Sequence, residues 1–143
     1  MVISAIYARM LEAMNTPPQM RNGEWAHERC ADSRKLHEAI WETRPDPEFV
    51  RDEVIPFLRD VMSAVLAVPR KGRYRTHIAK FARNIGLRAR NLCNFVDGKP
   101  SDFVPSSMLE AKIPANIPPE VQIRRIMKAI LPSGFTESPR ASV

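Results

Sequence analysis

Residues 76–97 read THIAKFARNIGLRARNLCNFVD. Apolar side chains recur at helical spacing on both sides of Gly86, and glycine readily adopts the left-handed backbone conformation that a tight turn needs. Ala82 is small enough to let a second helix approach the first, and the Thr76 hydroxyl can cap the first helix. We therefore expect two short helices that cross through a turn at Gly86, which is a helix-turn-helix motif.

Five apolar residues stand where two such helices would face each other: Phe81, Ile85, Leu87, Leu92 and Phe95. Together with the small residue four positions before Gly86, this spacing resembles the helix-turn-helix of lambda-repressor and Cro-like DNA-binding proteins. The resemblance covers the 22 residues from Thr76 to Asp97. It implies that the second helix lies in the major groove of double-stranded DNA. The all-α fold class is predicted separately, because prolines punctuate helical stretches and no period-two strand runs occur.

The outer face of that second helix supplies the candidate site residues. The resemblance implies contacts with base edges from Arg88, Ala89, Arg90 and Asn94. Arginine can donate two hydrogen bonds to guanine, asparagine can pair with adenine, and alanine can touch the thymine methyl group. Contacts with DNA phosphates are expected from cationic and polar residues at the edges of the motif: Arg73, Arg75, Lys80, Arg83, Asn91 and Lys99.

The positive charge of the chain is concentrated around this motif, and the net charge is +6. Residues 1–69 carry 8 basic and 11 acidic side chains, residues 70–99 carry 9 and 1, and residues 100–143 carry 5 and 4. A corner of two helices in a larger core would fit the apolar pattern equally well, but it needs no such excess of positive charge. The charge distribution therefore favours a partner with many phosphates.

Helical spacing of apolar residues also predicts helices over about 3–14, 24–42 and 120–130. Asp46 and Pro47 form a helix-start signal, which is followed by apolar residues at alternating spacings of four and three: Val50, Val54, Phe57, Val61, Ala64 and Val68. This stripe either packs into the core of its own domain or forms a dimer seam. Pro56 lies within the stripe, so we expect a kink or two abutting helices there. In the proline-rich residues 100–119, Ser107 and Glu110 could start a short helix.

These elements suggest three segments. Residues 1–45 would form an N-terminal helical extension for packing, oligomerisation or contact with a partner protein. Residues 46–131 would form the helical DNA-binding domain, and residues 132–143 a flexible tail. No apolar run approaches the roughly 20 residues that a membrane span needs. No signal peptide is recognisable either, so we expect no membrane contact and a cytoplasmic, nucleoid-associated location.

No motif in the sequence indicates catalysis. His27, Cys30 and His37 have poor zinc spacing and no fourth ligand. The acidic residues between positions 24 and 38 fit a solvated helix face better than a pair of catalytic carboxylates. There is no phosphate-binding glycine loop and no nucleophile elbow. We therefore expect a protein that is not an enzyme and that uses no cofactor and no metal.

The leading hypothesis is a sequence-specific transcriptional regulator that binds a pseudo-palindromic site on double-stranded DNA as a homodimer. Dimerisation is a separate inference, because one short recognition helix reads few base pairs and two-fold pairing doubles the site. Two alternatives stay open. The chain could be a DNA-docking subunit of a recombination or packaging complex, or a helical module that binds RNA or an acidic protein.

Overall fold

The computed structural model describes residues 2–130, and no strand occurs among them. The helices are α1 (Val2–Ala13), α2 (Gly23–Thr43), α3 (Pro47–Phe49), α4 (Ile55–Leu66), α5 (Ile78–Val96), α6 (Ser106–Ala111) and α7 (Pro119–Ala129). Two 3₁₀ turns, η1 (Pro18–Met20) and η3 (Pro100–Asp102), and a π-helical turn, η2 (Val50–Val54), complete the described chain. The all-α prediction is confirmed. The expected tail at 132–143 lies outside the described residues.

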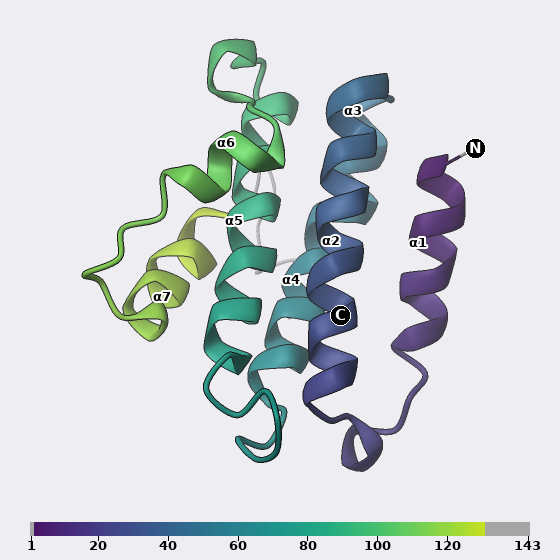
Figure 1. Ribbon diagram of the computed structural model, residues 1–143. Helices are drawn as coiled ribbons and strands as arrows, with labels where there is room; N and C mark the ends of the chain where they lie inside the picture. Colours follow the sequence, from purple (N-terminus) through teal and green to yellow (C-terminus); the bar gives the residue numbers. More distant parts are fainter. Residues whose placement is uncertain (1, 131–143) are drawn as a thin grey trace, which may run out of the picture.

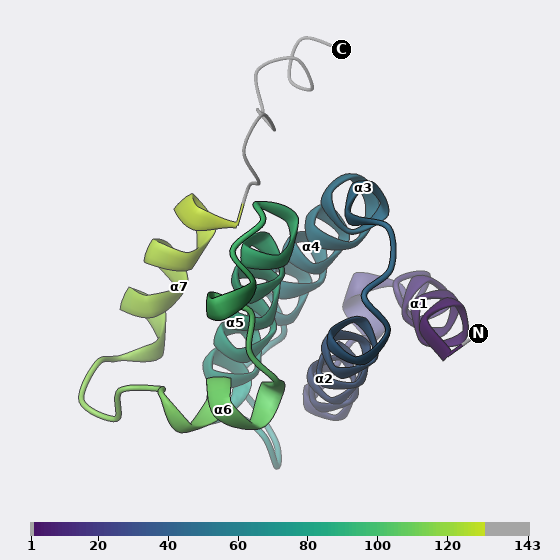
Figure 2. The same ribbon diagram turned by 90° about the horizontal axis from the view of Figure 1, so that it is seen from above.

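Helix α5 lies at the centre of the bundle (Figures 1 and 2). It packs against α4, α2, α7 and α6, whereas α1 packs on α2 at one side of the molecule. The loop between α4 and α5 lies at the same end of the bundle as the start of α2 (Figure 1). None of the described helices has the length and apolar character that crossing a membrane requires.

The predicted helix-turn-helix is wrong, because α5 runs without a break from Ile78 to Val96. Gly86 lies inside this helix and is not among the residues with positive φ. A Cβ atom at Gly86 would lie 2.5 Å from Met62 Sδ and 2.8 Å from Ile126 Cγ2. The glycine therefore serves close packing of α4 and α7 against α5. Thr76 makes no capping hydrogen bond either, since the N-cap position belongs to His77.

The apolar stripe from Val50 to Val68 packs into the core of its own chain, which decides between its two interpretations. Val50, Val54 and Val61 have no exposed surface, and Val68 is almost completely buried. Before Pro56 the backbone widens into η2, in which the Ile55 N–H donates to the Val50 carbonyl five residues earlier. A π turn is a usual place for such an interruption, because proline has no N–H to continue the helical ladder.

The helices expected near 3–14, 24–42 and 120–130 are confirmed as α1, α2 and α7. Helices α1 and α2 share one core with the rest of the chain, because Met10, Leu36 and Ile40 are fully buried in the same cluster as the α4 and α5 side chains. The Trp25 indole Nε1–H donates to the Ala13 carbonyl at 3.1 Å and fixes the connection between α1 and α2. Residues 2–45 and 46–130 therefore share one packed core.

Candidate nucleic-acid interface

The four residues expected to contact bases do not form one exposed face. Ala89 has no exposed surface and Arg88 is only 3% exposed, so neither can reach a DNA groove from this fold. Asn94 is partly exposed, but its Nδ2 donates to the Asp102 carbonyl at 3.0 Å. Arg90 alone of the four is exposed. The recognition surface expected from the helix-turn-helix resemblance is therefore not present, because α5 is the central helix and its faces are covered.

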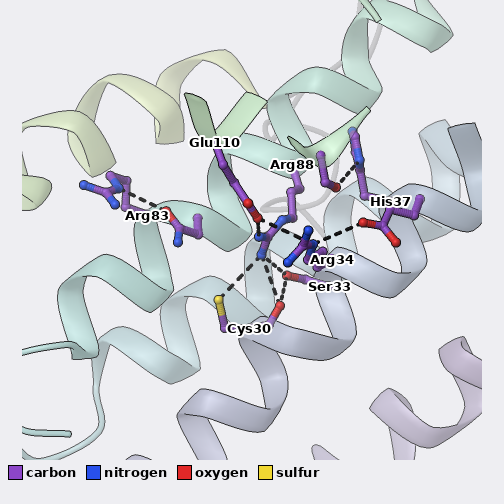
Figure 3. Close-up of polar contacts among 10 residues, drawn as sticks. Cys30, Ser33, Arg34, His37, Arg83, Arg88 and Glu110 are labelled. Atoms are coloured by element: carbon purple, nitrogen blue, oxygen red, sulfur yellow. Dashed lines mark hydrogen bonds and ion pairs between the residues drawn. The ribbon is translucent and has the colours of Figure 1, made fainter. Parts of the chain in front are cut away.

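Arg88 instead joins three helices (Figure 3). Its guanidinium donates to the Cys30 carbonyl at 3.1 Å, to Ser33 Oγ at 3.0 Å and to Glu110 Oε1 at 2.7 Å. Cys30 and Ser33 lie on α2, and Glu110 lies on α6. A buried guanidinium requires such partners, since an unpaired buried charge is strongly unfavourable. Arg88 is thus a structural connection between α2, α5 and α6.

Asn91, expected at a phosphate, is buried beside His37, so that expectation is also wrong. Its Nδ2 donates to the Asp102 carbonyl and its Oδ1 accepts from the Val104 N–H. Because Oδ1 is an acceptor, His37 Nε2 must carry the proton in their 2.9 Å hydrogen bond, and His37 Nδ1 accepts from the Ser106 hydroxyl at 2.7 Å. Burial lowers the pKa of His37 to about 4, so His37 is neutral at pH 7.

Two more of the expected phosphate contacts are either partly buried or distant from the rest. Arg83 is partly buried, and its guanidinium donates to Asn84 Oδ1 at 3.1 Å and to Gln122 Oε1 at 3.4 Å. Burial lowers the pKa of Arg83. Lys99 is exposed beyond the C-terminal end of α5, after a turn at Gly98 with φ of +73°. The Lys99 N–H donates to the Asn94 carbonyl, so with a rise of about 1.5 Å per residue Lys99 lies roughly 20 Å from Lys80 along the axis of α5.

The remaining predicted phosphate contacts gather at one end of the bundle. We use the name basic loop for residues 70–77, which connect α4 to α5. Five cationic residues in this loop and in the first turn of α5 are exposed: Arg70, Lys71, Arg73, Arg75 and Lys80. No acidic residue occurs in the sequence from Val61 to Val96. The chain therefore concentrates positive charge where the backbone leaves the core.

The basic loop is anchored by aromatic side chains. The Tyr74 ring stacks on His27 of α2 at a centroid distance of 5.0 Å and contacts Phe81 of α5 at 5.6 Å. A Cβ atom at Gly23 would lie 2.9 Å from Tyr74 Cβ, so this glycine allows the loop to pack on the start of α2. Arg70 Nη1 donates to the carbonyls of Leu66 and Val68 at the end of α4.

The aromatic cluster of His27, Tyr74, His77 and Phe81 was not recognised in the sequence. His27 is far from the other three members in the chain, and the sole sequence signal was the group of aromatic rings at positions 74, 77 and 81. No group of metal-ligating side chains occurs within residues 2–130. Comparison of the chain with protein-family models, curated proteins and solved structures finds no match.

Proposed function

We propose that this protein binds double-stranded DNA through phosphate contacts made by the basic loop and Lys80, and that it acts as a non-enzymatic docking component of a regulatory or DNA-processing assembly. The observation that carries the proposal is the anchored loop, which together with Lys80 presents five exposed cations with no acidic residue nearby in the sequence. Several cations that can neutralise phosphates together supply most of the affinity of non-specific DNA binding.

The geometry of the loop favours a duplex over a single strand. A single strand is bound largely by stacking of its bases on free aromatic faces. Here the Tyr74 ring is already engaged by His27, and the Arg73 guanidinium lies 5.2 Å from its centroid. Phe81 is in turn covered by ring contacts with His27 and His77. The cluster therefore holds the loop in place, and the exposed cations of the loop can contact a phosphate backbone.

An anionic membrane is a less suitable partner for the same cations. Proteins that lie on membranes combine positive charge with apolar side chains that enter the lipid. Among residues 2–130, the exposed large hydrophobic residues are at positions 2, 11, 20, 108 and 127, and none of them belongs to the basic loop. A polar, phosphate-rich duplex matches a loop of this composition better.

Sequence-specific recognition by a homodimer is not part of the proposal, because the recognition helix that it needs is not formed. Phosphate contacts position a protein on DNA but carry little information about base sequence. We therefore expect similar affinities for unrelated duplexes of equal length. Specific regulation would have to come from a partner protein in the same assembly.

Neutralising two loop cations should weaken duplex binding by about tenfold or more, because each phosphate contact that is lost also loses the favourable release of counterions from the DNA. The variant is Arg73→Gln/Arg75→Gln. Its matched control is Arg124→Gln/Lys128→Gln, which removes two exposed cations of α7 and leaves the same net charge. Fluorescence anisotropy with a 20-base-pair duplex measures both affinities.

The control should weaken duplex binding by less than about threefold. Both variants lose the same positive charge, so the long-range attraction to DNA falls equally, but only the loop variant also loses phosphate contacts. Equal losses in the loop variant and the control would show that net charge acts without a defined interface, and would contradict the proposal. Competition in which structured RNA displaces the duplex at far lower concentration would contradict it in favour of RNA. Much tighter binding of one duplex sequence than of others would indicate contacts with bases and would contradict the proposal.

A further inference from the structure

A second positively charged feature lies between α5, α7 and the segment that follows α6. It is a pocket of about 240 Å³ with a mixed polar and apolar wall. Cations reach it from three elements: Arg90 from α5, Lys112 from the end of α6, and Arg125 from α7. Arg90 lies about 12 residues along α5 from its start, so the pocket is roughly 18 Å from the basic loop along the helix axis.

None of these three cations forms a hydrogen bond or an ion pair with another residue of the described chain. Several other arginines are paired with an acidic side chain: Arg9 binds Asp32, Arg51 binds Asp52 and Arg88 binds Glu110. No acidic side chain lines the pocket. Three unpaired positive charges around one concavity repel one another, and a bound anion would remove that repulsion.

The pocket also offers a neutral donor. Gln122 is 8% exposed, and its Oε1 accepts a hydrogen bond from Arg83 at 3.4 Å. This contact identifies the oxygen side of the amide, and Nε2 donates to no residue of 2–130. An amide N–H₂ next to three cations is suited to an oxyanion, which accepts hydrogen bonds through several oxygens.

The rest of the wall is apolar and is supplied by Leu87, Pro114, Ile117 and Ile126. An inorganic ion gains no favourable contact from apolar side chains. The volume is below the range of about 300 to 1,000 Å³ that holds drug-sized molecules, so the ligand must be small. Guanidinium groups bind phosphate with paired hydrogen bonds, and two arginines with one lysine supply more than enough positive charge to neutralise a dianion.

We propose that this pocket binds a phosphate monoester with a small apolar body. The phosphate lies among Arg90, Lys112, Arg125 and the Gln122 amide, and the organic part lies on Leu87 and Ile126. Such a group occurs in small phosphorylated molecules and at the 5′ end of a nucleic-acid strand. The proposal does not depend on DNA binding by the basic loop, because the two sites share no residue.

The test is a titration of the full chain with phenyl phosphate, followed by ¹H–¹⁵N chemical shifts. We expect saturable shifts at Leu87, Arg90 and Arg125, and weaker binding of inorganic phosphate, which lacks the apolar part. Arg90→Gln/Arg125→Gln should weaken phenyl phosphate binding by about tenfold or more. Arg124→Gln/Lys128→Gln is the matched control, because it also removes two exposed cations and neither residue lines the pocket.

Binding that saturates in the wild type and the control but is weakened in the double variant supports the site. No saturable binding, or binding that the double variant leaves unchanged, overturns it. A second arm compares oligonucleotides with a 5′-phosphate and a 5′-hydroxyl. A difference that requires Arg90 and Arg125 assigns the monoester to a strand end, and equal binding of the two assigns it to a small molecule.

Discussion

Arg88→Ala is expected to lower the free energy of unfolding by about 2 to 4 kcal/mol, because it breaks a partly buried ion pair, removes hydrogen bonds to Cys30 and Ser33 and leaves a cavity. The side chain of Arg88 is 4% exposed and makes its shortest hydrogen bond, 2.7 Å, to Glu110. Loss of this contact also weakens the attachment of α6 to α5, while the hydrogen bond between Ser106 and His37 still joins α6 to α2. Urea denaturation followed by circular dichroism measures the change.

Arg90→Ala is the matched control, since Arg90 lies two residues further along the same helix but is exposed and unpaired. It should unfold at nearly the same urea concentration as the wild type. The two residues were equivalent candidates for base contact in the sequence, and this pair of variants separates them. If Arg88→Ala were as stable as Arg90→Ala, Arg88 would be exposed in solution and the central place of α5 would be wrong.

Stability is expected to fall by about 2 kcal/mol between pH 7 and pH 5 through His37 alone. The pKa of buried His37 is about 4, against an ordinary value of 6.5. Between these values the unfolded chain binds a proton that the folded chain does not, so the free energy of unfolding rises with pH. The contribution of His37 is complete above pH 6.5 and falls by roughly 3 kcal/mol in total as pH approaches 4.

His37→Gln should be less stable at pH 7, because it loses the hydrogen bonds to Ser106 and Asn91, and it should show a much flatter dependence between pH 5 and pH 7. The chain has two other histidines, His27 and His77, both exposed. His27→Gln/His77→Gln is therefore the control and should keep the pH dependence of the wild type. Urea denaturation at half-unit pH steps makes the comparison, and an unchanged slope in His37→Gln would contradict the buried, neutral histidine.

The helices at both ends of the described chain could be predicted because an amphipathic period is a property of one segment. The period around Gly86 could not be interpreted uniquely. Two short helices that pack around a turn require apolar residues at certain positions. One long helix that is covered on several sides requires apolar residues at the same positions. The deciding contacts are those of Gly86 with Met62 and Ile126, which come from distant parts of the sequence.

The site residues likewise include some features that could be predicted from the sequence and some that could not. The charge of the basic loop could be predicted, since nine of thirty residues in the window 70–99 are basic and a short loop exposes most of its side chains. The burial of Arg88 could not, because it depends on Glu110, 22 residues away, and on two α2 groups. Asn91 was misassigned for the same reason, because its partner His37 is 54 positions earlier.

The most direct test of DNA binding by the basic loop is the slope of log K against log salt concentration. Lys71, Arg73, Arg75 and Lys80 form no hydrogen bond or ion pair through their charged groups within residues 2–130. Four phosphate contacts predict a slope of about −3 to −4 for duplex DNA. Arg73→Gln/Arg75→Gln should be less steep by about 2, and Arg124→Gln/Lys128→Gln should keep the wild-type slope. A wild-type slope near zero, or an equal slope in the loop variant, would contradict phosphate binding by this loop.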